Sequence, residues 1–374
     1  MSQTPTTGAW AMPRGVIVLL GIAGAVVTVA GVKAISSIVG PVFLALVLTI
    51  SVQPLPAYLR RRGWPTWAAF VVTVLLVYGI MIGLFLAMAF AIARLATLLP
   101  EYADRLDDLT ARFTAFLHDH GIDPDHTQTM LSKLDAHNLL SGLGTILSGT
   151  LGVASALIFL IILLVFMAAD AMSFPARLAL VGRSRPDITG ALHSFASGTR
   201  SYLLVSTVFG LIVAVLDSAA LWAMSIPLPI LWGLISFITN YIPNIGFIIG
   251  LFPPALLGLL DGGWQKMLAV IAVYSVINVV IQSFIQPKFV GDAVDLSLTL
   301  TFLSLAFWTW VIGPLGAILA IPLTLFAKAL LIDIDPATRW AGSLMTMKVP
   351  DDEKDETADD AHSAQPGTAH GGGG

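Results

Sequence analysis

The sequence predicts an all-α polytopic membrane protein with about eight apolar segments, two of which form broken re-entrant hairpins of opposed orientation. Hydrophobic residues make up 56% of the 374-residue chain and charged residues 11%, whereas soluble domains carry about 25% charged residues. The mean hydropathy is +0.86. Long apolar runs recur along the chain, and two runs in its C-terminal half are interrupted by proline and glycine.

The first 93 residues are expected to hold three membrane spans. Residues 1–13 are polar and predicted to be disordered, and residues 14–93 contain the apolar runs Gly15–Val32, Ile38–Leu59 and Thr66–Ala93. The second run ends at Arg60, Arg61 and Arg62. Basic residues concentrate in cytoplasmic loops, so we expect this triplet and the N-terminus to be cytoplasmic.

Residues 94–145 are amphipathic and acidic, and crossing parity places them outside the membrane. Their apolar residues recur every three or four positions, which indicates helices on or just outside the membrane surface. A metal site can be imagined from the nearby histidines and acids, which are His118, Asp119, His120, Asp125 and His126. Spacing alone is a weak signal for metal ligands, so we expect a solvated turn and no metal.

Residues 146–225 are predicted to form two spans, Ile146–Ala169 and Tyr202–Met224, joined by a cytoplasmic loop. The basic residues of that loop are Arg177, Arg183, Arg185 and Arg200. The second of these spans contains one acid, Asp217, at its middle.

Helical spacing places Asp217 on one face with Gly210, Ala214 and either Ala220 or Leu221, so its side chain should face protein. Acids inside a membrane are rare unless they are paired, neutral or functional. Two interpretations stay open for this residue. Asp217 is either a protonated structural acid, hydrogen-bonded to a neighbouring helix, or the group that couples transport to protons or another cation.

Residues 226–332 are predicted to form a hairpin, a plain span and a second hairpin, with the plain span at Trp264–Ile285. The interrupted runs are Leu228–Leu260 and Leu296–Leu331. One crossing needs about 20 apolar residues, so each run suits two short helices that meet at a break. The residues expected at the breaks, and hence along a substrate pathway, are Asn240, Pro243, Asn244, Gly246, Pro253, Pro254, Gly313, Pro314, Gly316 and Pro322.

Broken helices of this kind either line a watery cavity, as in secondary transporters, or are merely kinked spans. Asn240 and Asn244 offer polar groups at the first break, but they could equally cap their own helices. Gln286, Pro287 and Lys288 lie at the predicted cytoplasmic end of the plain span. We regard them as gate candidates, with simple snorkelling of Lys288 as the alternative.

Several function classes lack the residues that they need. The chain has no cysteine, no Gly-Lys pair for a nucleotide-binding loop, no His-Glu-x-x-His and no Gly-x-Ser-x-Gly. We therefore expect no enzyme activity, no cofactor, no metal and no nucleic-acid partner. Residues 333–374 are expected to form a cytoplasmic tail with a disordered acidic end.

The C-terminal half resembles the autoinducer-2 exporter family of bacterial membrane transporters. The similarity lies in the runs 241–246, 286–291, 307–317 and 321–324, and the order of spans along the whole chain is similar too. Two positions depart from the family pattern, since Gln286 stands where many members carry Glu and Ser297 stands near a frequent His-Pro.

The resemblance implies a multi-pass protein of the bacterial inner membrane with both termini in the cytoplasm. It implies export of a small polar solute by a homo-oligomer that is surrounded by membrane lipid. The oligomer is expected to be a pentamer. Some relatives are sodium/proton antiporters, so protons or sodium are candidate partners and antiport is the alternative function. A membrane scaffold that transports nothing is the second alternative.

Overall fold

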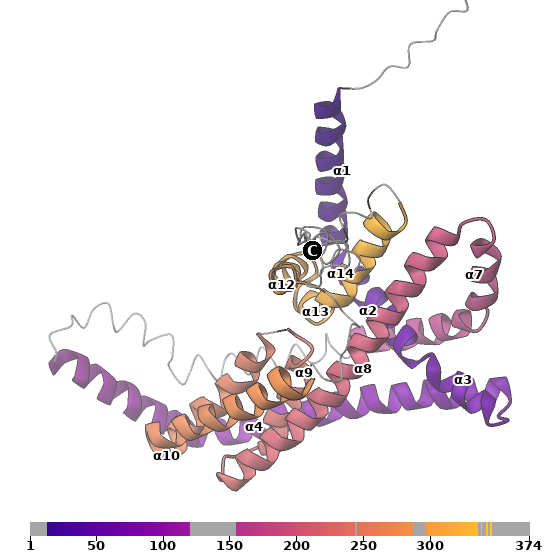
Figure 1. Ribbon diagram of the computed structural model, residues 1–374. Coiled ribbons are helices and arrows are strands. Elements are labelled where there is room, and N and C mark those ends of the chain that lie inside the picture. The colour runs from indigo at the N-terminus through magenta and orange to yellow at the C-terminus, as the bar shows by residue number, and fades with distance from the viewer. Residues whose placement is uncertain are drawn as a thin grey trace, which may run out of the picture.

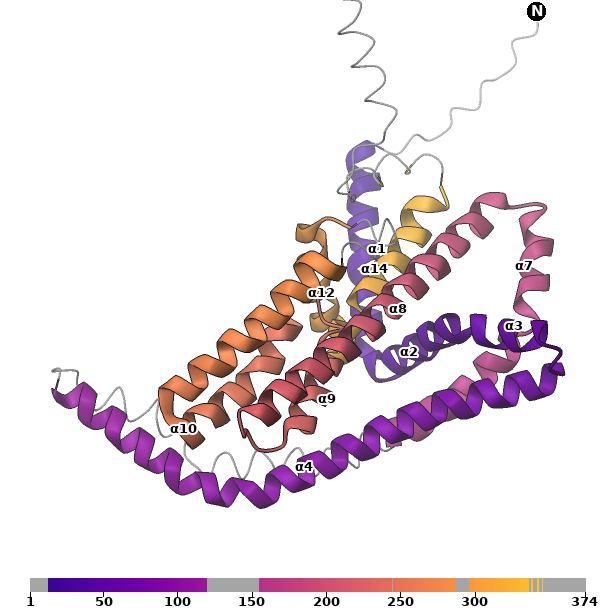
Figure 2. The same ribbon diagram turned by 60° about the horizontal axis from the view of Figure 1, so that its bottom comes forward.

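A computed structural model of the chain describes residues 13–119, 155–243, 245–286 and 296–335, with the single residues 338, 342 and 345. All regular secondary structure in these residues is helical, as predicted. Figures 1 and 2 show the helices gathered around the long helix α8, with α1 projecting away from the others. The predicted disordered ends, 1–12 and 350–374, lie outside the described residues.

The first two predicted spans are confirmed as helices. Helix α1 covers Arg14–Ala34, and the second span is formed by α2, Ser36–Val52, and α3, Pro54–Arg61. Pro54 begins α3 at the first helical position, where its missing N–H has no partner to lose. Gly40 of α2 packs against the side chains of Ile312 and Leu315, which places α2 beside the C-terminal hairpin.

The third span continues without a break far beyond the predicted boundary at Arg94. Helix α4 runs from Thr66 to Asp119, and at 1.5 Å per residue its 54 residues extend about 81 Å. Figure 2 shows it passing beneath the other helices as a long bent rod. Its polar outer half carries apolar residues on one side, Leu95 and Tyr102, and these pack against the core instead of starting a separate surface helix.

The loop that was predicted to be cytoplasmic is shorter than expected because α8 begins early. A helix at Ser155–Ala171 is followed, after a bend of 53°, by α7 at Phe174–Gly182. Helix α8 then covers Pro186–Ala223, so the expected loop residue Arg200 lies inside it. The Arg200 guanidinium donates to the Ile50 carbonyl at 3.3 Å and to Gln53 Oε1 at 3.0 Å, and this fixes α8 against the end of α2.

The remaining helices form the two predicted hairpins and the span between them. They are α9 (Pro229–Thr239), α10 (Gly246–Asn278), the π-helix η2 (Val279–Ile285), α12 (Leu298–Ile312), α13 (Pro314–Ile318), α14 (Ala320–Lys328) and the π-helix η3 (Ala329–Asp333). Helix α10 has non-helical backbone at Gly262 and Gly263, where it turns back on itself. We call Gly246–Asp261 its first limb and Trp264–Asn278 its second limb.

Within the described residues, five helical stretches are long and apolar enough to cross a membrane, if the folded stretch Gly246–Gln282 is counted as one. The bent pair at Ser155–Ala171 and Phe174–Gly182 would make a sixth. The predicted number of about eight apolar segments included the two hairpins, whose helices α9 and α12 contain only 11 and 15 residues. These helices measure about 16 and 22 Å, which is short of the roughly 30 Å hydrocarbon core.

The two largest buried clusters of the described residues lie around the two halves of α8. The first joins α2, α8 and the second hairpin, with Phe43, Phe195 and Phe326 in edge or tilted contact at centroid distances of 5.3 to 6.4 Å. The second joins α8, α9 and both limbs of α10 around Leu221 and Trp232. Helix α8 is therefore shared by both clusters.

Candidate functional site

The first hairpin turns where the sequence predicted, between α9 and the first limb of α10. Ile242 N–H donates to the Thr239 carbonyl at 2.8 Å, and Gly246 N–H donates to the Ile242 carbonyl at 3.1 Å, so backbone bonds close the turn around Pro243. The limbs touch directly at Gly246, where an added Cβ would lie 1.8 Å from the Thr239 carbonyl oxygen. Only glycine permits that approach. Asn244 lies outside the described residues.

The predicted second break in this segment, at Pro253 and Pro254, is wrong. Both prolines lie inside the helical first limb of α10, and Pro254 is buried in its packing. A proline keeps a helix-compatible φ and costs one hydrogen bond, a loss that packed membrane helices tolerate. The chain reverses instead at Gly263, whose φ of 74° disfavours other residues. The sequence signal for this reversal was the pair Gly262 and Gly263, just after the apolar run Leu228–Leu260.

The second hairpin turns at Gly313 and Pro314, as predicted. Gly313 has a φ of 78° and ends α12, and Pro314 occupies the first position of α13. An added Cβ at Gly316 would lie 1.9 Å from the Trp308 carbonyl oxygen, so these limbs also touch. Trp308 Nε1 donates to Thr324 Oγ1 of α14 at 3.0 Å, which ties the limbs together. Pro322 is buried in the first turn of α14 and does not break it.

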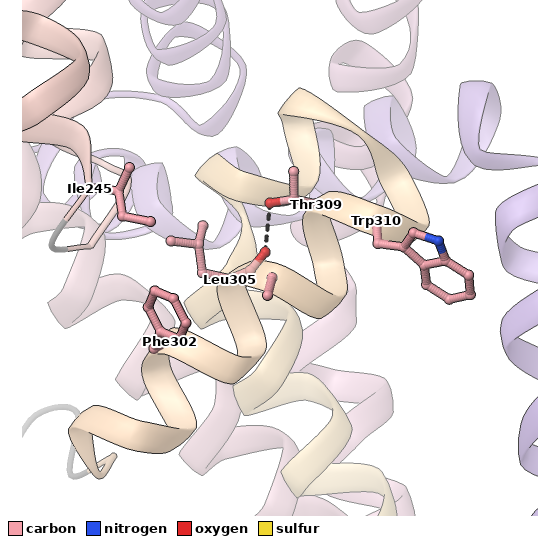
Figure 3. Close-up of a pocket in the computed structure, with 6 residues that line it drawn as sticks. Ile245, Phe302, Leu305, Thr309 and Trp310 are labelled. Atoms are coloured by element: carbon pink, nitrogen blue, oxygen red, sulfur yellow. Dashed lines mark hydrogen bonds between the residues drawn. The ribbon is translucent and has the colours of Figure 1, made fainter.

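The tip of the first hairpin packs on the side of the second. Ile242 and Ile245 contact a small buried cluster formed by Leu305, Ala317 and Ala320. Between Ile245 and α12 lies a groove of about 370 Å³, lined by Ile245, Phe302, Leu305, Ala306, Thr309 and Trp310. Figure 3 shows Ile245 and Leu305 pointing toward each other. Apart from Thr309 and the indole nitrogen of Trp310, the side chains that line the groove are apolar.

The groove offers no free side-chain hydroxyl in this state. Thr309 Oγ1 donates to the Leu305 carbonyl of its own helix at 2.6 Å, as the dashed line in Figure 3 marks. Such back-bonding satisfies the hydroxyl inside the helix.

Asn240 bridges two other elements, and its side chain does not cap α9. Its Nδ2 donates to the Ser206 carbonyl of α8 at 3.2 Å, and its Oδ1 accepts from Gln282 Nε2 of η2 at 3.2 Å. Asn240 is the C-cap residue of α9, and its backbone N–H donates to the Ser236 carbonyl at 3.0 Å. Asn240 also packs directly over Gly210, where an added Cβ would lie 2.8 Å from Asn240 Nδ2. Asn240 therefore takes the capping position with its backbone, while its side chain links α9 to α8 and η2.

A ladder of amide side chains continues from Asn240 along α10 and into η2. Gln282 Nε2 donates to Asn278 Oδ1 at 2.9 Å, and Asn278 Nδ2 donates to the Tyr274 carbonyl at 2.9 Å. We call Asn278, Gln282 and Asn240 the amide ladder. The sequence held a signal that we missed, because Tyr274, Asn278 and Gln282 recur every four residues in a run whose other polar residues are two serines.

Asp217 lies where α8, α9 and the second limb of α10 meet. The predicted face is confirmed, since Gly210, Ala214, Asp217 and Leu221 are all buried and Asp217 is 0% exposed. Helix α9 approaches at Gly233, where an added Cβ would lie 1.8 Å from Ser218 Oγ.

Both carboxylate oxygens of Asp217, and the hydroxyl of Tyr274, are buried without a hydrogen-bond partner. The Ser236 side chain lies beside both groups, yet within hydrogen-bonding geometry of neither.

Comparison with known proteins now identifies the family. The family described as AI-2E family transporter matches residues 17–335. The chain belongs to the AI-2E transporter family. It is 28% identical over 315 residues to the AI-2 transport protein TqsA of Escherichia coli K12, covering 84% of this chain and 90% of TqsA. It is 31% identical over 334 residues to a Haemophilus influenzae protein named "Putative transport protein", covering 86% and 94%.

Membership in the AI-2E family confirms the expected resemblance and makes the chain a bacterial membrane transporter. The matched residues include both hairpins and Asp217. A transporter family also favours the expectation that the chain is not an enzyme. Within the described part of the chain, no group of three or more His, Cys, Asp or Glu is arranged to hold a metal ion.

Two predicted features of this AI-2E protein fall partly or wholly outside the described residues. Gln286 is half-buried just after η2, whereas Pro287 and Lys288 of the predicted gate are not described. The histidine cluster is likewise outside, since His120, Asp125 and His126 are not described. Their roles stay predictions.

Proposed function

We propose that this AI-2E family protein is a secondary transporter that exports a small polar molecule across the bacterial inner membrane. The solute is of the autoinducer-2 type or a related metabolite. One observation carries the proposal, which is the contact of two broken helical hairpins inside the apolar bundle. Broken helices that meet in this way mark the binding region in many secondary transporters.

The two hairpins are re-entrant in this proposal. Helices α9 and α12 are too short to cross, and each limb returns beside its partner, at Gly246 in one hairpin and Gly316 in the other. The first hairpin enters from outside and the second from the cytoplasm, since each returns to the side on which it started. Their tips therefore approach each other at membrane depth.

Transport proceeds by separation of the hairpins. The contact of Ile242 and Ile245 with the second hairpin is the closed state, because an apolar seal excludes a polar solute. Opening exposes the polar groups of the first tip, including Asn240 and the first N–H groups of α10, which suit hydroxyls and anions. The remaining pathway residues are those that shape the breaks, Pro243, Gly313 and Pro314, together with Asn244.

The cytoplasmic end and the assembly complete the proposal. Gln286, Pro287 and Lys288 close the cytoplasmic side, with Lys288 as the charged member. Both termini lie in the cytoplasm. The subunits assemble as a homo-oligomer, by resemblance a pentamer, with lipid around the exposed apolar helices such as α1.

Flux measurements test this function. Proteoliposomes that contain the full chain and are loaded with autoinducer-2 should release it, and an imposed pH or sodium gradient should change the rate. Pro243→Leu should abolish release while assembly is kept, because the turn around Pro243 shapes the first tip. Pro186→Leu, at the start of α8, is the matched control and should transport normally.

The outcomes of this measurement separate the candidate functions. Gradient-driven ion exchange without any solute release would replace export with sodium/proton antiport. The buried Asp217 favours antiport as the second candidate, because ion exchange requires an ionisable group in the membrane. Absence of both fluxes would leave the scaffold function.

A further inference from the structure

Two buried polar groups from different helices face each other without a hydrogen bond. They are the Asp217 carboxyl of α8 and the Tyr274 hydroxyl of α10, and each is 0% exposed. Within the described residues, the Thr199 hydroxyl is the other side-chain group that is buried without a hydrogen-bond partner. Buried polar groups are almost always paired, so an unpaired acid beside an unpaired hydroxyl calls for an explanation.

The surroundings of Asp217 do not neutralise a charged carboxylate. The groups that face it are the Ser236 hydroxyl from α9 and the Tyr274 hydroxyl from α10. Among the described salt bridges, those of lysine and arginine involve Asp170, Asp261 and Asp333 and never Asp217. A buried carboxylate without a cation is strongly disfavoured, so the carboxyl must bind a proton or another cation to stay in this position.

The packing favours a proton over a metal ion. Helices α8 and α9 touch at Gly233, where an added Cβ would lie 1.8 Å from the Oγ of Ser218, the residue after Asp217, and 2.7 Å from the Ala214 carbonyl oxygen. Hard cations such as Ca²⁺ require six or more oxygen ligands, and one carboxylate with two hydroxyls supplies fewer. A proton needs a single oxygen and no added volume.

We infer that Asp217, Tyr274 and Ser236 form a proton-binding site, and that the amide ladder links this site to the tip of the first hairpin. The inference rests on the proposed function and deepens it by naming the coupling ion and its site. The link runs from the Tyr274 carbonyl through Asn278 and Gln282 to Asn240.

The π-helix η2 starts directly after Asn278, and such segments often accompany functional sites.

The site acts through the charge of one carboxyl. When a proton binds an Asp217 oxygen, the carboxylate becomes a neutral carboxylic acid whose O–H donates to Ser236 or Tyr274, and the three helices pack closely. When the proton leaves to water, the carboxylate accepts from the two hydroxyls and attracts water between α8 and α10. The second limb of α10 then shifts, and the amide ladder carries the shift to Asn240.

Infrared spectroscopy tests the proton site without any solute. The purified full chain in lipid should show the carbonyl band of a protonated buried carboxyl, which disappears as the pH is raised and is missing in Asp217→Asn. In Tyr274→Phe the band should persist to a higher pH, because the Asp217 carboxylate loses the tyrosine hydroxyl as a hydrogen-bond donor. A tenfold gain in proton affinity would raise the pH at which the band disappears by about one unit. Tyr78→Phe, whose hydroxyl bonds to Ile161 elsewhere, should leave the band unchanged.

Two results would overturn the proton assignment. One is a spectrum of Asp217→Asn that equals the wild-type spectrum at every pH. The other is loss of the band on addition of sodium chloride but not choline chloride at constant pH, since the site would then hold a metal ion. Neither measurement depends on transport, so a failed flux assay would affect the proposed function and leave this test intact.

The ladder is tested with a label at the tip, which the absence of cysteine makes simple. A fluorophore on a single cysteine at Ile248, an exposed position of α10, should report a change of environment over the pH range of the infrared titration. Gln282→Leu should keep the infrared band but lose the fluorescence change. A variant that keeps both signals would show that the ladder does not connect the site to the tip.

Discussion

The close contact between the hairpin limbs predicts how three glycine-to-alanine variants rank in stability. At Gly246 an added Cβ would lie 1.8 Å from the Thr239 carbonyl oxygen, whereas ordinary contact begins at 3.4 Å. The limbs must therefore separate by more than 1 Å at the tip. At Gly250 the nearest atom, Ser236 Oγ, is 3.1 Å away, and at Gly24 of α1 nothing lies within 4 Å.

The expected costs follow from these distances. Overpacking costs about 1–3 kcal/mol, so Gly246→Ala should destabilise the protein by roughly that amount. Gly250→Ala should be close to neutral, since a few tenths of an ångström of adjustment offset a gain in helix propensity of about 1 kcal/mol. Gly24→Ala should be neutral or slightly stabilising. The loss of stability expected for Gly246→Ala should lower the unfolding temperature by several degrees.

Thermal unfolding of the detergent-solubilised chain measures this ranking, with the nine tryptophans as the fluorescent probe. Size-exclusion chromatography of the same samples checks that assembly is unchanged. If Gly246→Ala unfolds at the same temperature as Gly250→Ala, the limbs do not touch at the tip, and the hairpin described above is incorrect.

Two further predictions concern topology and the second hairpin. Single cysteines at Arg183 and Lys288 should react with an impermeant reagent only from the cytoplasm, and a cysteine at Asp125 only from outside; outside labelling at Lys288 would contradict the opposed orientation of the hairpins. Trp308→Phe should lose the hydrogen bond to Thr324 and destabilise the protein by about 1 kcal/mol, measured by thermal unfolding. Equal stability of the variant and the wild type would mean that the indole does not tie the limbs.

The hairpin breaks were predictable because they depend on local backbone chemistry. Gly313 adopts a positive φ and Pro314 begins the next helix, which is the behaviour that their types favour. The buried face around Asp217 was predictable for a similar reason, since small residues at helical spacing permit a close neighbour. Both features depend on residues that lie close together in the sequence.

Features that depend on distant partners were not predictable. Pro253 and Pro254 form the same kind of local signal as Pro243, yet neighbouring helices hold them inside a helix. The continuation of α4 past Arg94 depends on the apolar residues that pack Leu95 and Tyr102. Sequence spacing alone gave no measure of these tertiary contacts.

The amide ladder combines both kinds of information. Its spacing along α10 is local, but its meaning arises only when Gln282 meets Asn240, 42 residues earlier in the chain. Neither residue could be assigned a partner from the sequence, because the amides could equally bond within their own helices.

The strength of the contacts indicates where the molecule can open. The first hairpin is joined to α8 by close approach at Gly233 and by the bond from Asn240 to the Ser206 carbonyl, and to η2 by the amide ladder. The second hairpin is joined to α2 and α8 by the aromatic cluster around Phe195. Among the described residues, the two hairpins meet through the apolar contacts of Ile242 and Ile245 and the groove beside them.

Within the described residues, the boundary between the two hairpins therefore has the weakest directional bonding, and α8 packs on both sides of it. Phe195 in its first half packs with the second hairpin, and Leu221 in its second half packs with the first. Opening the groove without unfolding requires each half of α8 to move with its own cluster, so the bend must fall between them, near Thr199 and Ser206. Spin-label distances across the groove should then vary with pH, while distances within either cluster stay constant; the reverse pattern would place the moving boundary elsewhere.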